Sequence, residues 1–369
     1  MIPVNEPILD GNERKYLNEC IDTGWISSEG PFVKQLETGF STRVGRQFGI
    51  AVCNGSVALD TAVAALNIGP GDEVILPAFT IISCGAAIVR AGATPVCVDA
   101  LPDTWNMDVS QIESRITSKT KAIMIVHIYG LPVDVDPVLR LAGKYNLKII
   151  EDAAEMHGQA YNGKPCGSFG DISTFSFYPN KHITTGEGGM IVTDDPVLAQ
   201  RCASLRNLCF DRERRYIHEE LGWNFRMSNI QAALGVAQLE RLDEFVEKKR
   251  YIGDRYTALL SGLDALQLPI PRTSYAQNIY WVYAIVLKPE IPFNAIEMIR
   301  RLGDKKIGTR HFFYPMHRQP VFLKRGLFKN ITLPVSENLA ERGFYIPSGL
   351  AITDSQIEAV AMAIREVLP

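Results

Sequence analysis

Short runs of apolar residues alternate with segments in which apolar residues recur at three and four positions, from about residue 48 to residue 200. The short runs are typical of buried strands, and the three-and-four spacing is typical of helices that pack by one face. We expect strands at residues 49–53, 73–76, 94–98, 122–128 and 148–151, and helices at residues 32–40, 82–91, 110–116 and 137–145. This alternation predicts an α/β fold with a mostly parallel sheet between two layers of helices.

The pattern changes on both sides of this region. Helical periodicity covers residues 6–23, and after a polar, arginine-rich segment at 207–220 it returns from 230 to 260, where one or two long helices are expected. A smaller set of elements follows, with strands near 279–287 and 308–314, a helix at 295–302 and a closing helix at 354–367 that should bury Ile357, Val360, Met362 and Ile364. A long helix commonly joins two lobes, so we predict a large domain over residues 1–245 and a smaller C-terminal domain over residues 246–369.

Composition narrows the class of protein. The 369 residues carry a net charge of -3, with no run of five like charges, which argues against a nucleic-acid-binding protein or one that binds an anionic membrane. The first residues lack the pattern of a signal peptide, and no stretch of about 18 apolar residues occurs, so we expect a cytoplasmic protein. The seven cysteines form no CxxC pair, which argues against a zinc ribbon and a disulfide framework, and no metal site is expected.

One lysine stands in a loop between two apolar runs, in DISTFSFYPNKHITTGEGGM at residues 171–190. Pro179 ends the first run, and three glycines after Lys181 permit a tight turn before the second. A lysine crowded by aromatic side chains loses hydration, which lowers its pKa and makes its amine a nucleophile toward carbonyl groups. Lys181 is therefore a candidate Schiff-base residue, and a solvated loop lysine is the alternative.

Two other segments place polar groups at the ends of predicted strands. Asp152 follows the strand at 148–151, at the edge of a parallel sheet where ligands bind, and its apolar neighbours imply that a cation or several donors meet it. A helix N-cap is the alternative for Asp152, but it would not explain Glu155 and His157. In CNGSVALDTA, a turn at Asn54 and Gly55 leads into a helix with Ser56 at the expected cap position, where free amide hydrogens form a phosphate cradle.

These segments, taken with several others in the same order, resemble the sugar aminotransferases of the DegT/DnrJ/EryC1/StrS family. The matching blocks are GWISSEGPFVKQLE, NGSVALDTA, GDEVILPAFT, AIMIVHIYG, IEDAAEMHG, STFSFYPNK with TTGEGGMIVT, and LGWNFRMSNIQAALG. The family has the fold type I of aspartate aminotransferase and uses pyridoxal 5'-phosphate, passing through pyridoxamine 5'-phosphate. The resemblance implies a large domain with a mostly parallel, seven-stranded sheet and a smaller α+β domain.

The resemblance also implies roles for particular residues. Lys181 matches the Schiff-base lysine that also moves the proton, and Asp152 matches the carboxylate beside the pyridine nitrogen. The matching phosphate ligands are Ser56 with the adjoining amides of Gly55 and Val57, Ser176, and Asn224, which the other subunit donates. Glu155 matches a polar position near the phenolic oxygen of the cofactor. Ile81 stands where many relatives carry an aromatic residue on the cofactor ring, so apolar contact replaces stacking.

Within the family, the chain is most similar to members that aminate C4 of a GDP-linked 4-keto-6-deoxymannose for surface polysaccharide or O-antigen synthesis. This similarity implies small-molecule substrates, L-glutamate and the keto sugar, and a homodimer with shared sites. Candidate substrate contacts are Trp25, His182, Arg310, His311, Tyr314 and His317. A strand of the small domain with a surface histidine is an equally good interpretation of residues 309–319.

Two alternatives to transamination remain open at this point. Related sugar 3-dehydratases share a histidine at the position of His182, but they replace the Schiff-base lysine with another histidine, whereas this chain has Lys181. The second alternative is a regulator without catalytic activity, which would have lost Lys181 or Asp152. Both residues are present.

Overall fold

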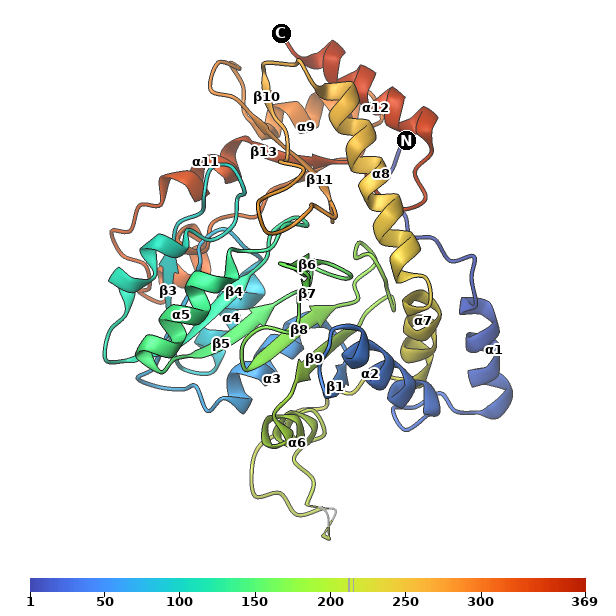
Figure 1. The fold of residues 1–369 in the computed structure, drawn as a ribbon, viewed down its shortest axis with the longest axis vertical. Helices are drawn as coiled ribbons and strands as arrows, with labels where there is room; N and C mark the ends of the chain where they lie inside the picture. Colours follow the sequence, from blue (N-terminus) through green and yellow to red (C-terminus); the bar gives the residue numbers. More distant parts are fainter. Residues whose placement is uncertain (212, 215) are drawn as a thin grey trace.

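The computed structural model describes residues 1–211, 213–214 and 216–369, and its centre is a seven-stranded sheet (Figure 1). The strand order is β1-β9-β8-β5-β4-β2-β3. The strands are β1 (Phe48–Val52), β2 (Glu73–Pro77), β3 (Thr94–Val98), β4 (Thr120–Val126), β5 (Lys148–Asp152), β8 (Ile172–Ser176) and β9 (Gly189–Thr193). Only β9 runs antiparallel to its neighbours β1 and β8, and the other recorded pairs are parallel. The predicted mostly parallel sheet is confirmed.

Helices cover both faces of this sheet, which explains why its strands are apolar throughout. In β4, Met124 and Val126 join one core cluster, and Ile123 and Ile125 join the other. The first cluster includes side chains of α3 (Gly55–Ala65), α4 (Ile82–Arg90) and α6 (Pro196–Leu205). The second includes side chains of α2 (Pro31–Arg43), α5 (Val135–Tyr145) and α7 (Asn229–Leu239), and α7 also contacts α1 (Glu13–Thr23).

A second, four-stranded sheet follows the long helix α8 (Leu242–Leu260) along the chain (Figure 1). Its order is β10-β11-β13-β12, and all its strands pair antiparallel. The strands of this sheet are β10 (Leu266–Gln267), β11 (Tyr283–Leu287), β12 (Arg310–His311) and β13 (Gly343–Ile346). The helices of the same part of the chain are α9 (Ala295–Asp304), α10 (Pro320–Lys324), α11 (Pro334–Arg342) and α12 (Asp354–Val367). A third core cluster joins this sheet to α8, α9 and α12. The start of the chain also contacts this region, because Ile2 forms a parallel bridge with Ile307.

Several element predictions need correction. Residues 110–116 form two short 3-10 turns, Val109–Gln111 and Glu113–Arg115, because Asp108 accepts hydrogen bonds from the amide and hydroxyl of Ser110 and competes with a helix. The N-terminal helix begins only at Glu13, after a segment that contains a proline and a glycine.

Two individual side chains also differ from expectation. The cap of α3 is Asn54, whose side chain accepts the amide hydrogen of Val57 at 3.0 Å, so Ser56 lies inside the first turn. Met362 was expected to be buried but is 61% exposed, because in α12 it lies two positions from buried Val360 and Ile364 and so faces away from them.

A small two-stranded sheet, β6 (Ala160–Tyr161) with β7 (Lys164–Pro165), follows β5 along the chain. No helix within the described residues has the length and hydrophobicity that crossing a membrane requires.

Candidate active site

The loop between β8 and β9 carries Lys181, and it is held at several points. The amide of Phe177 donates to the carbonyl of Gly188 at 2.8 Å, which closes the base of the loop. The indole nitrogen of Trp281 donates to the carbonyl of Asn180 at 2.7 Å, directly before the lysine. The position of Lys181 therefore depends on a residue a hundred positions away in the chain.

The amine of Lys181 lies over an aromatic ring and near two carboxyl groups. Its Nζ is 3.7 Å from the centroid of the Trp281 ring, and the residue is half-buried. Burial lowers the pKa of Lys181, and the charges of Glu155 and Asp152 oppose that shift. These surroundings differ from those of a fully solvated loop lysine and suit an amine that must spend part of its time unprotonated.

Asp152 ends β5 and is 3% exposed. Its Oδ1 accepts the amide hydrogen of Ala154 at 3.1 Å, and its Oδ2 accepts from the Cys84 thiol at 3.2 Å. Burial raises the pKa of Asp152, although these two donors and the charge of Lys181 act against the rise. Asp152 is followed directly by no helix in the described part of the chain, where the next elements are short strands, so the N-cap interpretation is wrong.

Glu155 is a second buried carboxyl group in the same place. Its Oε2 accepts the amide hydrogen of Tyr129 at 2.6 Å. Burial raises the pKa of Glu155 to about 8, against the opposing effect of Lys181. The group is therefore mainly protonated at neutral pH, when its hydroxyl can donate a hydrogen bond.

Three short side chains and a helix terminus form a cradle beside this region. Gly55 begins α3 in contact with Ser176, since a methyl group on Gly55 would lie 2.7 Å from the Ser176 Cβ. The hydroxyl of Ser56 is 2.7 Å from that of Ser83 in the first turn of α4. The Val57 amide is already bonded to Asn54, whereas within the described residues the amide hydrogens of Gly55 and Ser56 have no acceptor. A helix terminus with free amides and nearby hydroxyls suits a phosphate group.

The residues expected to meet the substrate fall into two sets. Trp25, Arg310, His311 and Tyr314 are exposed, and Ile81 is 42% exposed at the start of α4. Phe313, between His311 and Tyr314, lies nearly parallel to the ring of Trp281 with centroids 6.5 Å apart. Residues 310–314 therefore run beside the aromatic side chain that contacts Lys181.

His182 and His317 have different surroundings. The Nε2 of His182 is 3.2 Å from the carbonyl oxygen of Ile279, and burial lowers the pKa of His182 to about 3. The Nε2 of His317 is 2.8 Å from a carboxylate oxygen of Glu337. Both residues are at most 2% exposed, so neither imidazole faces open solvent.

Asn224 lies outside the cradle. It is exposed and forms an isolated bridge with Asn207, and the next residues pass the end of β1, where Arg226 forms a bridge with Val52. No hydrogen bond of its side chain is recorded among the described residues.

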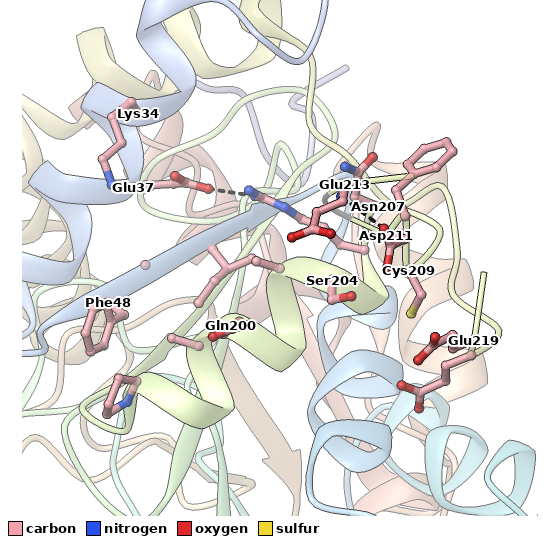
Figure 2. A pocket seen from close by; sticks show the side chains of 18 residues that line it. Lys34, Glu37, Phe48, Gln200, Ser204, Asn207, Cys209, Asp211, Glu213 and Glu219 are labelled. Atoms are coloured by element: carbon pink, nitrogen blue, oxygen red, sulfur yellow. Dashed lines mark hydrogen bonds and ion pairs between the residues drawn. The ribbon is translucent and has the colours of Figure 1, made fainter. Parts of the chain in front are cut away.

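A cavity of about 900 Å³, drawn in Figure 2, has no residue of the lysine loop in its described lining. Residues of α2, β1, α6 and the following loop line it, and on one wall Arg206 pairs with Glu37 at 2.6 Å. Its described lining includes none of the predicted site residues and is rich in acidic groups, among them Asp211, Glu213 and Glu219. An acidic lining is unsuited to a phosphate.

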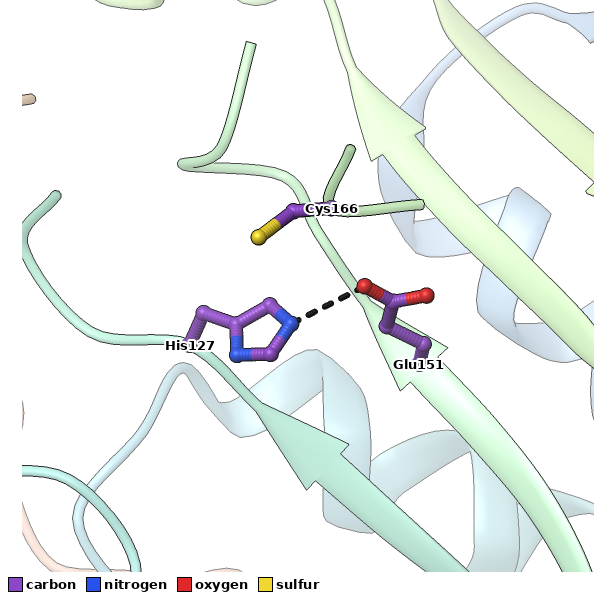
Figure 3. A group of neighbouring side chains, drawn as sticks. All are labelled: His127, Glu151 and Cys166. Carbon is purple, nitrogen blue, oxygen red and sulfur yellow. Dashed lines mark hydrogen bonds and ion pairs between the residues drawn. The ribbon is translucent and has the colours of Figure 1, made fainter. Parts of the chain in front are cut away.

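His127, Glu151 and Cys166 form a compact cluster that could suggest a metal site (Figure 3). His127 Nδ1 accepts the Val133 amide hydrogen at 3.0 Å, so its Nε2 carries the proton and donates to Glu151 at 3.0 Å. The carboxylate of Glu151 also accepts from the amides of Gly167 and Phe169 and from the hydroxyl of Ser173. These four donors occupy the carboxylate, so the cluster is a hydrogen-bond network that supports the start of the 166–170 segment.

Sequence reasoning missed three residues of the site: Trp281, Cys84 and Ser83. Trp281 belongs to no recognised block, and its contact with Lys181 depends on how the second sheet packs against the first. Cys84 and Ser83 follow the recognised PAFT segment, where the helical spacing of α4 could have suggested that they face Asp152 and Ser56.

The arrangement fits pyridoxal phosphate. Asp152 is a buried carboxylate, and its side chain forms no ion pair within the described residues. Its charge is therefore available to pair with a protonated pyridine nitrogen. Lys181 is the nearby amine, and the cradle of Gly55, Ser56 and Ser176 has donors for a phosphate.

Comparison with known proteins agrees with the use of pyridoxal phosphate. Residues 7–365 match the model of the DegT/DnrJ/EryC1/StrS aminotransferase family. The GDP-perosamine synthase of Escherichia coli O157:H7 is 43% identical over 365 residues, which cover 99% of this chain and 98% of that protein. The GDP-perosamine synthase of Vibrio cholerae is 40% identical over 366 residues, with coverage of 99% and 98%. A Streptococcus pneumoniae protein described as a sugar aminotransferase, solved in its PLP form, superposes with a TM-score of 0.91 at 26% identity and full coverage of both chains.

These relatives favour transamination over the dehydratase and regulatory alternatives. The chain belongs to the DegT/DnrJ/EryC1/StrS aminotransferase family, and it is a pyridoxal-phosphate-dependent sugar aminotransferase.

Proposed function

We propose that this enzyme transfers the amino group of L-glutamate to C4 of GDP-4-keto-6-deoxy-D-mannose, giving GDP-perosamine. The observation that carries the proposal is the 43% identity, over nearly the whole chain, to a GDP-perosamine synthase. A half-buried lysine beside two buried carboxyl groups supplies the acid and base groups that such a reaction needs.

Each residue of the site receives a role in this proposal. Lys181 would hold the resting cofactor through its amine, and its freed amine would exchange a proton with the reacting carbon, for which its lowered pKa is suited. Asp152 holds the pyridine nitrogen in its protonated form. Bound pyridoxal phosphate supplies an electron sink that stabilises the carbanion left when that proton departs. Glu155, protonated near neutral pH, donates toward the phenolic oxygen.

The phosphate would lie at the start of α3. We assign the amides of Gly55 and Ser56 and the hydroxyls of Ser56 and Ser176 as its donors, with Ile81 against the cofactor ring. Val57 takes part through the helix terminus, since its own amide hydrogen is bonded to Asn54.

The nucleotide sugar would approach past the exposed residues Trp25, Arg310, His311 and Tyr314. Arg310 offers a charge for the diphosphate, and Tyr314 and Trp25 offer aromatic surface for the sugar or base. For His182 and His317 we propose indirect roles, since both are buried against protein groups.

The active enzyme is proposed to be a homodimer in which Asn224 of each subunit completes the phosphate site of the other. The exposure of Asn224 in the single chain supports this assignment. Leu221 in the same segment is 90% exposed, as expected for an apolar side chain that a partner subunit covers. A phosphate with about two negative charges also needs more donors than one cradle provides.

Three broader features complete the proposal. The chain divides into a large domain over residues 1–245 and a small domain over residues 246–369, in line with the separate core cluster of the second sheet. The cytoplasm is the proposed compartment, because all seven cysteines are free thiols. The product would serve surface polysaccharide or O-antigen synthesis.

The test is to incubate the enzyme with L-glutamate and a panel of GDP- and dTDP-linked 4-keto-6-deoxy sugars and to identify the products by mass. We expect an amino sugar from the GDP-mannose derivative and 2-oxoglutarate in equal amount. Amination of only a dTDP sugar would contradict the proposed substrate, and a dehydrated product would contradict the proposed reaction.

A further inference from the structure

Cys84 contacts the carboxylate on which the cofactor ring depends. It lies in the first turn of α4, is fully buried, and places its Sγ 3.2 Å from Asp152 Oδ2. The hydroxyl of Thr80 is 3.7 Å from the same sulfur. Cys97, in the same core cluster, is similarly buried, but no hydrogen bond of its thiol is recorded among the described residues.

The direction of this hydrogen bond follows from the charges. A carboxylate accepts, and a thiolate next to Asp152 in the core would place two negative charges together without solvent. Burial and the charge of Asp152 raise the pKa of Cys84 well above its usual value. The thiol is therefore protonated, and its hydrogen points to Oδ2.

Packing holds the thiol in this position independently of any ligand. Gly85, the next residue, lies so close to Met316 that a methyl group there would be 2.6 Å from the Met316 sulfur. The amide of Met316 in turn donates to the carbonyl of Ala78 at 2.7 Å, near the start of α4. The helix thus approaches residue 316 closely, and Cys84 is carried onto Asp152.

We propose that Cys84 is a positioning residue for Asp152, which orients the carboxylate and sets its basicity toward the ring nitrogen; this rests on the proposed role of Asp152. The side chain of Asp152 has two recorded donors, the Ala154 amide on Oδ1 and the Cys84 thiol on Oδ2. A thiol is a weak donor, so it fixes the carboxylate while leaving most of the negative charge on Oδ2. A hydroxyl in its place withdraws more of that charge, and a methyl group withdraws none.

The test uses Cys84→Ala and Cys84→Ser, with Cys97→Ala as the matched control. The first measurement is the infrared S–H stretch of the protein without cofactor, in which the band lost in Cys84→Ala is assigned to Cys84. We expect this band at lower frequency than that of Cys97, and we expect Asp152→Asn to shift it. A Cys84 band at the frequency of the Cys97 band would show that the thiol does not donate a hydrogen bond to Asp152.

The second measurement is the ¹⁵N chemical shift of the ring nitrogen in bound, ¹⁵N-labelled pyridoxal phosphate. A proton shared between the ring nitrogen and Asp152 would move toward the carboxylate as the carboxylate becomes more basic. Cys84→Ala should therefore move the shift toward the unprotonated value and Cys84→Ser toward the protonated value, while Cys97→Ala leaves it unchanged. For loss of a hydrogen bond to a charged group, kcat of Cys84→Ala should fall about tenfold with little change in KM, and Cys84→Ser should recover part of it.

Equal ring-nitrogen shifts in Cys84→Ala, Cys84→Ser and the control would overturn the positioning role. Failure of the proposed function is recognised separately, because Asp152→Asn would then leave the ring-nitrogen shift unchanged. The infrared band depends only on the thiol and Asp152, so it reports their contact in either case.

Discussion

Lys181, Asp152 and Glu155 place three ionisable groups in one buried region, with one amine for two carboxyl groups. If all three were charged, the region would hold a net negative charge away from water, which is costly. The pKa of Glu155, raised to about 8, relieves this cost because the carboxyl group is protonated at neutral pH. The negative charge then remains on Asp152, where the pyridine nitrogen is expected.

The change Asp152→Asn should leave the fold intact and reduce kcat about 100-fold, since a neutral amide cannot hold the ring nitrogen protonated. Asn can still accept the Ala154 amide hydrogen through its Oδ1. Asp171→Asn is the matched control, because Asp171 pairs with Lys148 at the opposite end of β5. Steady-state kinetics with circular dichroism check this, and a variant with near wild-type kcat would remove the proposed role of Asp152.

Glu155 should give the protein without cofactor a distinct pH dependence. Its pKa in the folded state is above the value near 4.5 expected on unfolding, so the stability it contributes is present at low pH and lost as pH rises toward about 8. The slope is about 1.4 kcal/mol per pH unit for one proton. Glu155→Gln, which keeps an acceptor for the Tyr129 amide, should lack this slope.

Denaturant titrations of both proteins between pH 5 and pH 9 provide the measurement. Parallel stability curves for the wild type and Glu155→Gln would show that Glu155 ionises normally in the folded protein.

Sequence reasoning selected Lys181, Asp152 and Glu155 as candidates because each lies in a distinctive local segment, and the structure brings the three together. It did not identify Trp281 or the Cys84 contact, because these depend on residues brought together from distant elements. It placed His317 among substrate contacts from its aromatic, basic surroundings, whereas the structure pairs that residue with Glu337.

At the scale of elements, the start of α3 is wedged between two strands. Gly55 contacts Ser176 of β8, and Gly189 of β9 lies so close that a methyl group there would be 2.6 Å from the carbonyl oxygen of Asn54. The glycines allow the helix terminus to approach the strand that leads to Lys181. The cradle and the lysine loop are therefore held at a fixed separation.

The change Gly55→Ala should weaken cofactor binding, because the added methyl group would push Ser176 away from the helix terminus. A loss on the order of tenfold or more in affinity is expected for a misplaced charged hydrogen bond. Gly143→Ala is the matched control, since a methyl group there meets nothing within 4 Å and should slightly stabilise α5. Fluorescence titration with pyridoxal phosphate measures both, and equal affinities would contradict the cradle.

The elements best predicted from the sequence were those with strong periodicity and clear ends. The closing helix at 354–367 and the strand at 94–98 have the expected boundaries. The helix prediction for residues 110–116 failed because the hydrogen bonds that Ser110 donates to Asp108 outweigh the weak helical spacing of the segment. Ser56 was mistaken for the cap because both it and Asn54 are good capping residues.

At the scale of the whole molecule, α8 leads from the layers around the first sheet to the second sheet (Figure 1). The alternation of strands and helices sufficed to predict the first sheet. We could not predict the contact of Trp281 with Lys181, or that of Phe313 with Trp281. These contacts join segments far apart in the chain, and no local sequence pattern encodes them.

The proposed sharing of active sites between subunits makes a prediction about mixed dimers. Lys181→Ala and Asn224→Asp should each be inactive, the second because a carboxylate would face the phosphate. If Asn224 acts on the partner's site, a mixed dimer contains one site with both lesions and one with neither. Activity should then return on subunit exchange, to about half the wild-type value per mixed dimer.

The matched control for this experiment mixes Lys181→Ala with Asp152→Asn. Both lesions lie in the site of their own subunit, so no intact site can form and no activity should return. Equal results from the two mixtures, with exchange demonstrated, would show that Asn224 serves its own subunit.

The most direct test of the account is borohydride reduction of the enzyme with bound pyridoxal phosphate, followed by peptide mapping by mass spectrometry. We predict a pyridoxyl group on the peptide that contains Lys181, at about one per chain, because this amine has a lowered pKa and lies near Asp152, the carboxylate assigned to the ring nitrogen. Lys181→Ala should lose both the label and catalytic turnover. A label on another lysine, or turnover retained by Lys181→Ala, would contradict the central claim.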